Sequence, residues 1–174
     1  MAPSPYLPVT RRFANPIYIR PEDIPEFAGL TQVQLDEIRP AVDACRAVNL
    51  TAELLERDPA WAVKRRVLEL VHAQPRNDER RAALDAFTAR EGAGLADFAL
   101  WCALVDRYGD PQDWPAEIAD ASSPAVANAR AELDEQFSFH IWCQWILDDQ
   151  FAAAQARAIE SGMALGVMHD LAVG

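Results

Sequence analysis

Residues 133–151 read LDEQFSFHIWCQWILDDQF, and this stretch decides the fold class. Its large apolar side chains recur at every fourth position, at Leu133, Phe137, Ile141 and Trp145. That period places them on one face of an α-helix, whereas a strand would alternate them every second residue. Ser123-Pro124 opens the pattern and Gly162 suits a left-handed helix end, so the sequence predicts one long helix over 123–162.

Helical signals also fill most of the chain before this stretch. A threonine cap predicts a helix over 31–48, in which Pro40 is expected to cause a break. Asp58-Pro59 opens a second helix with apolar residues at helical spacing, and Asn77 opens a third. Residues 95–108 are apolar almost all round, which predicts a buried helix.

The two ends of the sequence differ from this helical body. Residues 1–29 carry six prolines, which predict an extended arm with a short strand at Pro16-Ile17-Tyr18-Ile19. Residues 163–174 form a short apolar run interrupted by His169-Asp170, which predicts a buried strand. We therefore expect a mainly α fold: an arm over 1–29, helices over 30–162 and a strand over 163–174. A lone strand leaves backbone groups unpaired, so we expect a piece of a longer protein.

Charge and composition exclude several classes of protein. The net charge is −11, which opposes nucleic-acid binding but is compatible with neutral sugars. Lys64-Arg65-Arg66 is the best basic run, and we interpret it as a solvated helix face. No apolar run approaches the roughly 20 residues that span a bilayer, and Met1–Pro5 does not resemble a secretory signal. Three cysteines far apart in sequence indicate reduced thiols, so we expect a cytoplasmic protein.

Individual residues give weak signals for chemistry. His140 and Cys143 can share a helix face, but zinc needs three or four ligands and no second cluster exists in the sequence. As a base and nucleophile they lack an orienting group, and a core histidine is the simpler interpretation. Asp148 and Asp149 are helical neighbours that point about 100° apart, so they cannot converge on one bond. Asp170 ends an apolar strand, where parallel barrels present functional groups, although a turn aspartate is the alternative. We expect no metal and no cofactor.

Five segments form an ordered series along nearly the whole sequence. They are Ser4-Pro5-Tyr6 with Phe13 to Ile19, Asp58 to Lys64, Asp97 to Leu104 with Trp114-Pro115, Phe139 to Trp145 with Gln150, and Gly162-Met163 through Asp170 to Gly174. Together they resemble the amylomaltases, also called disproportionating enzymes or 4-alpha-glucanotransferases. The resemblance implies that this sequence is a helical insertion and one strand of a (β/α)8-barrel enzyme of glycogen and maltodextrin metabolism.

The same resemblance implies an activity and a site. Such enzymes transfer α-1,4-glucan segments between maltooligosaccharides by a retaining mechanism. Tyr6 and Asp170 match positions that line the glucan cleft, with Ser4 as a weaker neighbour. The family's nucleophile, acid/base and stabilising aspartate lie on later barrel strands, which this sequence does not contain. We therefore assign no catalytic residue here and predict that the chain alone is inactive.

Two interpretations from other classes remain open at this point. A free-standing helical interaction module would use the tryptophan-rich helices as a binding surface. A metalloprotein would use His140 and Cys143, and zinc analysis would distinguish it. If the helices belong to a barrel enzyme, their exposed barrel-facing surface predicts self-association of the isolated chain.

Overall fold

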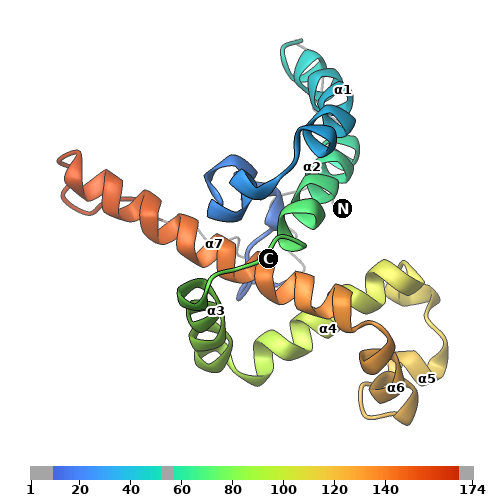
Figure 1. The fold of residues 1–174 in the computed structure, drawn as a ribbon. Helices are drawn as coiled ribbons and strands as arrows, with labels where there is room; N and C mark the ends of the chain where they lie inside the picture. Colours follow the sequence, from blue (N-terminus) through green and yellow to red (C-terminus); the bar gives the residue numbers. More distant parts are fainter. Residues whose placement is uncertain (1–9, 52–56, 169–174) are drawn as a thin grey trace. The chain divides into compact units, whose positions relative to one another are not determined.

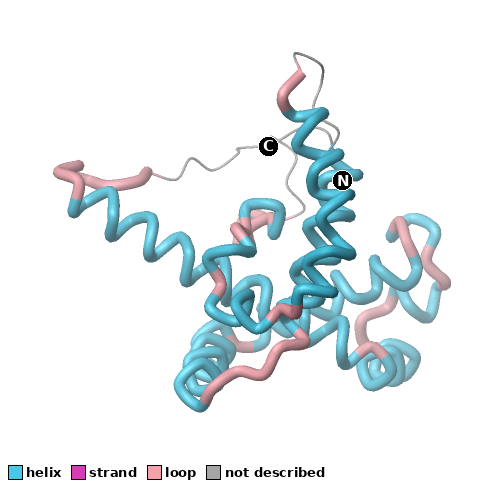
Figure 2. Tube along the Cα trace, turned by 45° about the horizontal axis from the view of Figure 1, so that its top comes forward, coloured by secondary structure: helices cyan, strands magenta, loops and turns pink. Residues whose placement is uncertain are grey.

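Residues 10–51 and 57–168 are described by a computed structural model, in which all regular structure is helical (Figures 1 and 2). The mainly α fold is therefore confirmed. The chain divides into two compact units, Met1–Arg76 with Ile146–Gly174, and Asn77–Trp145. Within the described ranges, every helix is too short or too polar to cross a membrane.

Where the structure describes it, the first unit contains three short 3-10 helices, two α-helices and the second part of a third. These are η1 (Pro16–Tyr18), η2 (Pro21–Asp23), η3 (Pro25–Gly29), α1 (Gln32–Asn49), α2 (Arg57–His72) and α7 (Asp134–Glu160). The helices α1 and α2 lie side by side (Figure 1). The buried side of α2 consists of Val67, Leu68, Leu70 and Val71, at the helical spacing read from the sequence.

Residues 16–29 of the proline-rich segment are folded into turns rather than extended. Pro16, Pro21 and Pro25 each stand at the start of a 3-10 helix. The predicted strand at residues 16–19 is therefore wrong. A proline at the first helical position loses no hydrogen bond, and its fixed φ already suits a helical turn. The Asn15 side chain completes the first turn by accepting a hydrogen bond from Ile17 N at 3.0 Å.

The helix α1 begins at the predicted residue. Thr31 and Gln34 form a capping box, in which each side chain bonds the other's backbone N–H. Pro40 lies inside α1 without ending it, so the expected break is wrong. The capped start and the packing on α2 offset the one backbone hydrogen bond that the proline removes.

The second unit contains the remaining helices and the first part of α7. They are α3 (Asp78–Glu91), α4 (Ala93–Tyr108), η4 (Pro111–Asp113), α5 (Ala116–Ala119) and α6 (Pro124–Glu132). Asn77 caps α3 as predicted, accepting from Arg80 N at 2.8 Å. In α4 only one face is buried, because Phe98 and Trp101 remain partly exposed, so the expected all-round burial is wrong.

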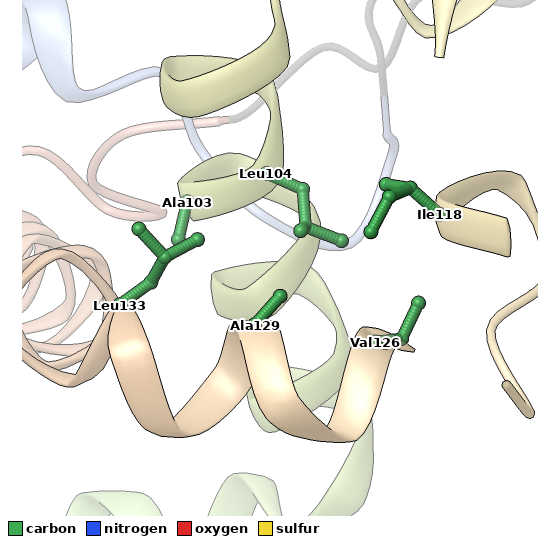
Figure 3. Packing of buried hydrophobic residues seen from close by; sticks show 6 residues of the cluster. All are labelled: Ala103, Leu104, Ile118, Val126, Ala129 and Leu133. Atoms are coloured by element: carbon green, nitrogen blue, oxygen red, sulfur yellow. The ribbon is translucent and has the colours of Figure 1, made fainter. Parts of the chain in front are cut away.

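The predicted long helix over 123–162 is two helices. Leu133 separates them, with φ −103° and ψ 27°. Figure 3 shows that Val126, Ala129 and Leu133 pack with Ala103, Leu104 and Ile118 in one apolar cluster. These three apolar residues, at positions i, i+3 and i+7, pack on α4 and α5. The helix α7 then begins at Asp134 with a new axis.

The end of α7 follows the sequence prediction closely. Gly162 has φ 94°, the left-handed conformation that glycine adopts without strain. Its N–H bonds the carbonyl of Ile159, and Met163 N bonds that of Ala158, which is the Schellman arrangement. Residues 163–168 contain no strand, because Gln155 bonds the backbone of Leu165 and Val167. The rest of the predicted strand lies outside the described residues.

Candidate functional site

Three of the sequence motifs meet in the first unit. Lys64 Nζ of α2 donates a hydrogen bond to the carbonyl of Ile17 at 2.6 Å. The amide of Gln150, on α7, binds the backbone of Arg20 twice, accepting from its N–H at 2.9 Å and donating to its carbonyl at 2.8 Å. Side chains from α2 and α7 therefore hold the first part of the 3-10 segment, residues 16–29, at Ile17 and at Arg20.

A cavity of about 640 Å³ opens where this segment faces α1 and α2. We call it the α1–α2 groove. Its apolar wall includes Ile38 and Val67, and Tyr18, which is 67% exposed, also lines it. The volume falls in the range of about 300–1,000 Å³ that is usual for small-molecule sites.

Charged side chains of the groove are unevenly distributed. The bases are Arg20, Arg39, Arg46, Arg57 and Lys64, and the acids are Glu22 and Asp43. Burial lowers the pKa of Lys64, and the charge of Glu22 partly opposes this effect. The groove is therefore basic within a chain whose net charge is −11.

The basic run 64–66 is used within the fold. Lys64 is held by Ile17 as described, Arg65 pairs with Glu69 at 2.9 Å, and Arg66 pairs with Glu37 at 3.0 Å. The solvated-face interpretation holds for Arg66, which is exposed, whereas Lys64 and Arg65 are half-buried. Three tethered cations that face different partners do not form a phosphate-binding stripe.

His140 and Cys143 behave as core residues in the second unit. His140 is buried, and its Nε2 lies 2.8 Å from Oδ2 of Asp106 on α4. Cys143 is also buried. Across the described residues, no group of three metal-ligating side chains occurs. The sequence analysis missed Asp106, because an acid 34 residues away gives no local signal for a partner of His140.

The remaining residues that the sequence singled out are two acids of α7, three cysteines and the predicted glucan contacts. Asp148 and Asp149 are both exposed on α7, as expected for a solvated face. Cys45, Cys102 and Cys143, all within the described part of the chain, form no disulfide. Ser4, Tyr6 and Asp170 lie outside the described residues, so their assignment to the glucan cleft stays a prediction.

Comparison with known proteins identifies the family. A sequence model described as 4-alpha-glucanotransferase matches residues 1–174. The chain is 45% identical over 174 residues to the 4-alpha-glucanotransferase of Mycobacterium bovis, covering 99% of this chain and 24% of that protein. It is 34% identical over 87 residues to the Thermus thermophilus enzyme of the same name, covering 49% of this chain and 17% of that protein.

The fold gives the same answer. A crystal structure of amylomaltase from Corynebacterium glutamicum aligns with a TM-score of 0.81 and 44% identity, over 98% of this chain and 22% of that one. The chain thus spans about a quarter of the length of the Mycobacterium bovis relative. Sequence and fold agree over essentially all of the residues compared, and the chain belongs to the 4-alpha-glucanotransferase family.

Proposed function

We propose that this chain is part of an enzyme that transfers α-1,4-glucan segments between maltooligosaccharides with retention of configuration. The family match over residues 1–174 carries the proposal. The amylomaltase fold match at a TM-score of 0.81 supports it independently of any single motif. The alternative of a free-standing interaction module has no support from these comparisons.

The chemistry explains why we expect this chain alone to be inactive. Retaining transfer requires a carboxylate nucleophile and an acid/base about 5–5.5 Å apart across the scissile bond. The resemblance implies that both groups lie on barrel strands that these 174 residues do not include. Asp148 and Asp149 do not replace them, because helical neighbours diverge and both are exposed on α7. The proposed role of residues 30–162 is that of a helical insertion packed against the barrel.

Substrate contacts are proposed for the two ends of the chain. The ring of Tyr6 would pack against the apolar face of a pyranose, leaving its hydroxyl for a polar partner. The carboxylate of Asp170 would accept hydrogen bonds from sugar hydroxyls at the end of its strand. Ser4 would be a neighbour of Tyr6 with a smaller contribution. A cytoplasmic location belongs to the same proposal.

A chimera tests the proposal directly. The corresponding segment of the Corynebacterium glutamicum amylomaltase is replaced by this chain, and products from maltotriose are separated. We expect glucose and longer maltooligosaccharides from the chimera and none from the isolated chain. Asp170→Asn should lower the activity of the chimera at least tenfold, in the usual range for lost contacts that matter in the transition state (~10²-fold or more in strong cases). Asp97→Asn, at an exposed position of α4, is the matched control.

The outcomes of this experiment separate clearly. A folded chimera without activity contradicts the proposed glucan transfer. Full activity in the Asp170→Asn chimera contradicts the proposed role of Asp170. Turnover by the isolated chain that Asp170→Asn abolishes would contradict the expected inactivity. Circular dichroism of each protein shows whether it is folded.

Self-association of the isolated chain is a further part of the proposal. The side chains of Leu165 and Met168 are 82% and 88% exposed, and Ile159 and Met163 are more than half exposed. Such a run of apolar surface favours contact with another apolar surface. Light scattering should show a concentration-dependent dimer that Leu165→Ser with Met168→Ser weakens. A monomer at every concentration would contradict this expectation.

A further inference from the structure

The α1–α2 groove collects positive charge in a strongly acidic chain. Among the residues that the structure describes, five basic residues line it, against two acidic residues. Arg39, Asp43 and Arg46 lie at positions i, i+4 and i+7 of α1, and therefore on one face. Arg57 and Lys64 are seven residues apart on the facing helix α2, which gives them the same alignment. The groove thus has charged residues on both of its long sides.

The arginines of α1 are held only loosely by their own ion pairs. Arg39 lies 3.1 Å from Asp36, with 60% of its side chain exposed. Arg46 lies 4.0 Å from Glu22, with 68% of its side chain exposed. Exposed pairs of this kind contribute little, and a ligand carrying a full negative charge competes with them easily. A guanidinium group can donate two parallel hydrogen bonds to the oxygens of a phosphate. The carboxylate of Glu22, at 4.0 Å from Arg46, is too far away to accept such a pair.

The framework of the groove is fixed before any ligand arrives. Gln150 holds the backbone of Arg20 through two hydrogen bonds, and Lys64 holds the carbonyl of Ile17. These contacts set the position of Tyr18, which lies between the two anchored residues with 67% exposure. An exposed ring on an anchored backbone is a ready platform for the apolar face of a sugar.

From this arrangement we propose that the α1–α2 groove binds a hexose phosphate. Arg39 and Arg46 bind the phosphate, Tyr18 packs against the pyranose ring, and the carboxylates of Glu22 and Asp43 accept hydrogen bonds from sugar hydroxyls. The site goes beyond the proposed glucan transfer and does not depend on it, because all of its residues lie in the described part of the first unit.

The mixed lining favours this class of ligand over other anions. Inorganic phosphate would use the arginines but would leave the ring and the apolar wall of the groove unoccupied. A neutral sugar would use the ring and the acids but would not engage the guanidinium groups of Arg39 and Arg46, whose side chains are 60% and 68% exposed.

Calorimetric titration of this 174-residue chain with glucose 1-phosphate tests the proposal, with glucose and inorganic phosphate as comparison ligands. We expect saturable binding of glucose 1-phosphate, and binding of each comparison ligand that is at least tenfold weaker. Arg39→Gln and Arg46→Gln should each weaken binding about tenfold, the usual effect of losing a charge-assisted hydrogen bond. Arg107→Gln, at an exposed position of α4 in the other unit, should have no effect.

Tyr18→Ala separates the sugar contact from the phosphate contact. This variant should weaken binding of glucose 1-phosphate and leave binding of inorganic phosphate unchanged. If glucose 1-phosphate shows no saturable binding at concentrations up to the millimolar range, the proposal is overturned. Equal affinities for glucose 1-phosphate and inorganic phosphate would overturn it too, as would an equal loss in Arg39→Gln and Arg107→Gln. Because this assay measures binding and the chimera measures glucan transfer, failure of one leaves the other intact.

Discussion

The side-chain amide of Gln150 forms a two-point clamp on the backbone of Arg20, 130 residues earlier in the chain. Its Oε1 accepts from Arg20 N at 2.9 Å, and its Nε2 donates to Arg20 O at 2.8 Å. The clamp pairs the N–H of Arg20 and adds a second donor to its carbonyl, which also accepts from Asp23 N at 3.2 Å. The clamp ties the start of η2 to α7 and so helps to define one wall of the α1–α2 groove.

Removing the clamp should loosen the 3-10 segment. Gln150→Met keeps the length of the side chain but deletes both hydrogen bonds, and we expect a loss of about 1–2 kcal/mol in the free energy of unfolding. Hydrogen exchange at the Arg20 amide should become faster. Gln155→Met is the matched control on the same helix, because it releases the amide of Val167 instead. Unchanged exchange at Arg20 in Gln150→Met would contradict the assigned role.

The pair formed by His140 and Asp106 should stabilise the second unit. Asp106→Ala leaves the Nε2 atom of a buried histidine without its partner at 2.8 Å, which costs about 1–3 kcal/mol. Asp97→Ala changes an exposed acid on the same helix, and its effect should stay within about 0.5 kcal/mol. Urea denaturation of both variants measures the difference. Equal midpoints for the two variants would refute a specific contribution of Asp106.

Stability of the first unit should decline in acid because of His72. Burial, together with the charge of Arg76, lowers the pKa of His72 from 6.5 to about 4. Between these two values the unfolded chain binds a proton that the folded chain does not, so stability rises with pH from about 4 to 6.5 and falls as pH drops through that window.

The variant His72→Gln tests that pH dependence. Without the histidine, the melting temperature should fall less between pH 6.5 and pH 4 than it does in the unchanged chain. The difference should correspond to about 1–2 kcal/mol, a figure reduced for the partial exposure of the ring. Thermal melts followed by circular dichroism at several pH values provide the measurement. Parallel curves for the two proteins would show that His72 does not contribute.

The glycine that ends α7 should tolerate no side chain without cost. Gly162→Ala places a Cβ in the left-handed conformation at φ 94°, and we expect a loss of about 1 kcal/mol. Gly94, which lies inside α4, provides the comparison, since Gly94→Ala should leave stability unchanged or raise it slightly. Thermal melting of the two variants distinguishes them. A Gly162→Ala chain as stable as Gly94→Ala would contradict the assigned conformation.

Local patterns determined the class of fold and most of the helix starts. The caps at Thr31 and Asn77 and the end at Gly162 were all predicted, because each depends on side chains within a few residues. The five segments that resemble the amylomaltases also identified the family, because each is a short run of residues and their order along the chain can be read directly. The predicted glucan contacts at Ser4, Tyr6 and Asp170 remain predictions.

Tertiary structure decided the features that depend on residues far apart in the sequence. Leu133 separates α6 from α7 where the apolar side chains of α6 pack on α4 and α5, and the unbroken period along the sequence gives no sign of this break. His140 and its partner Asp106 are 34 positions apart, and Gln150 and Arg20 are 130 positions apart. The residues of the basic groove come from several elements. Periodicity reports which face of a helix is apolar, whereas the choice of what covers that face is made by packing between elements.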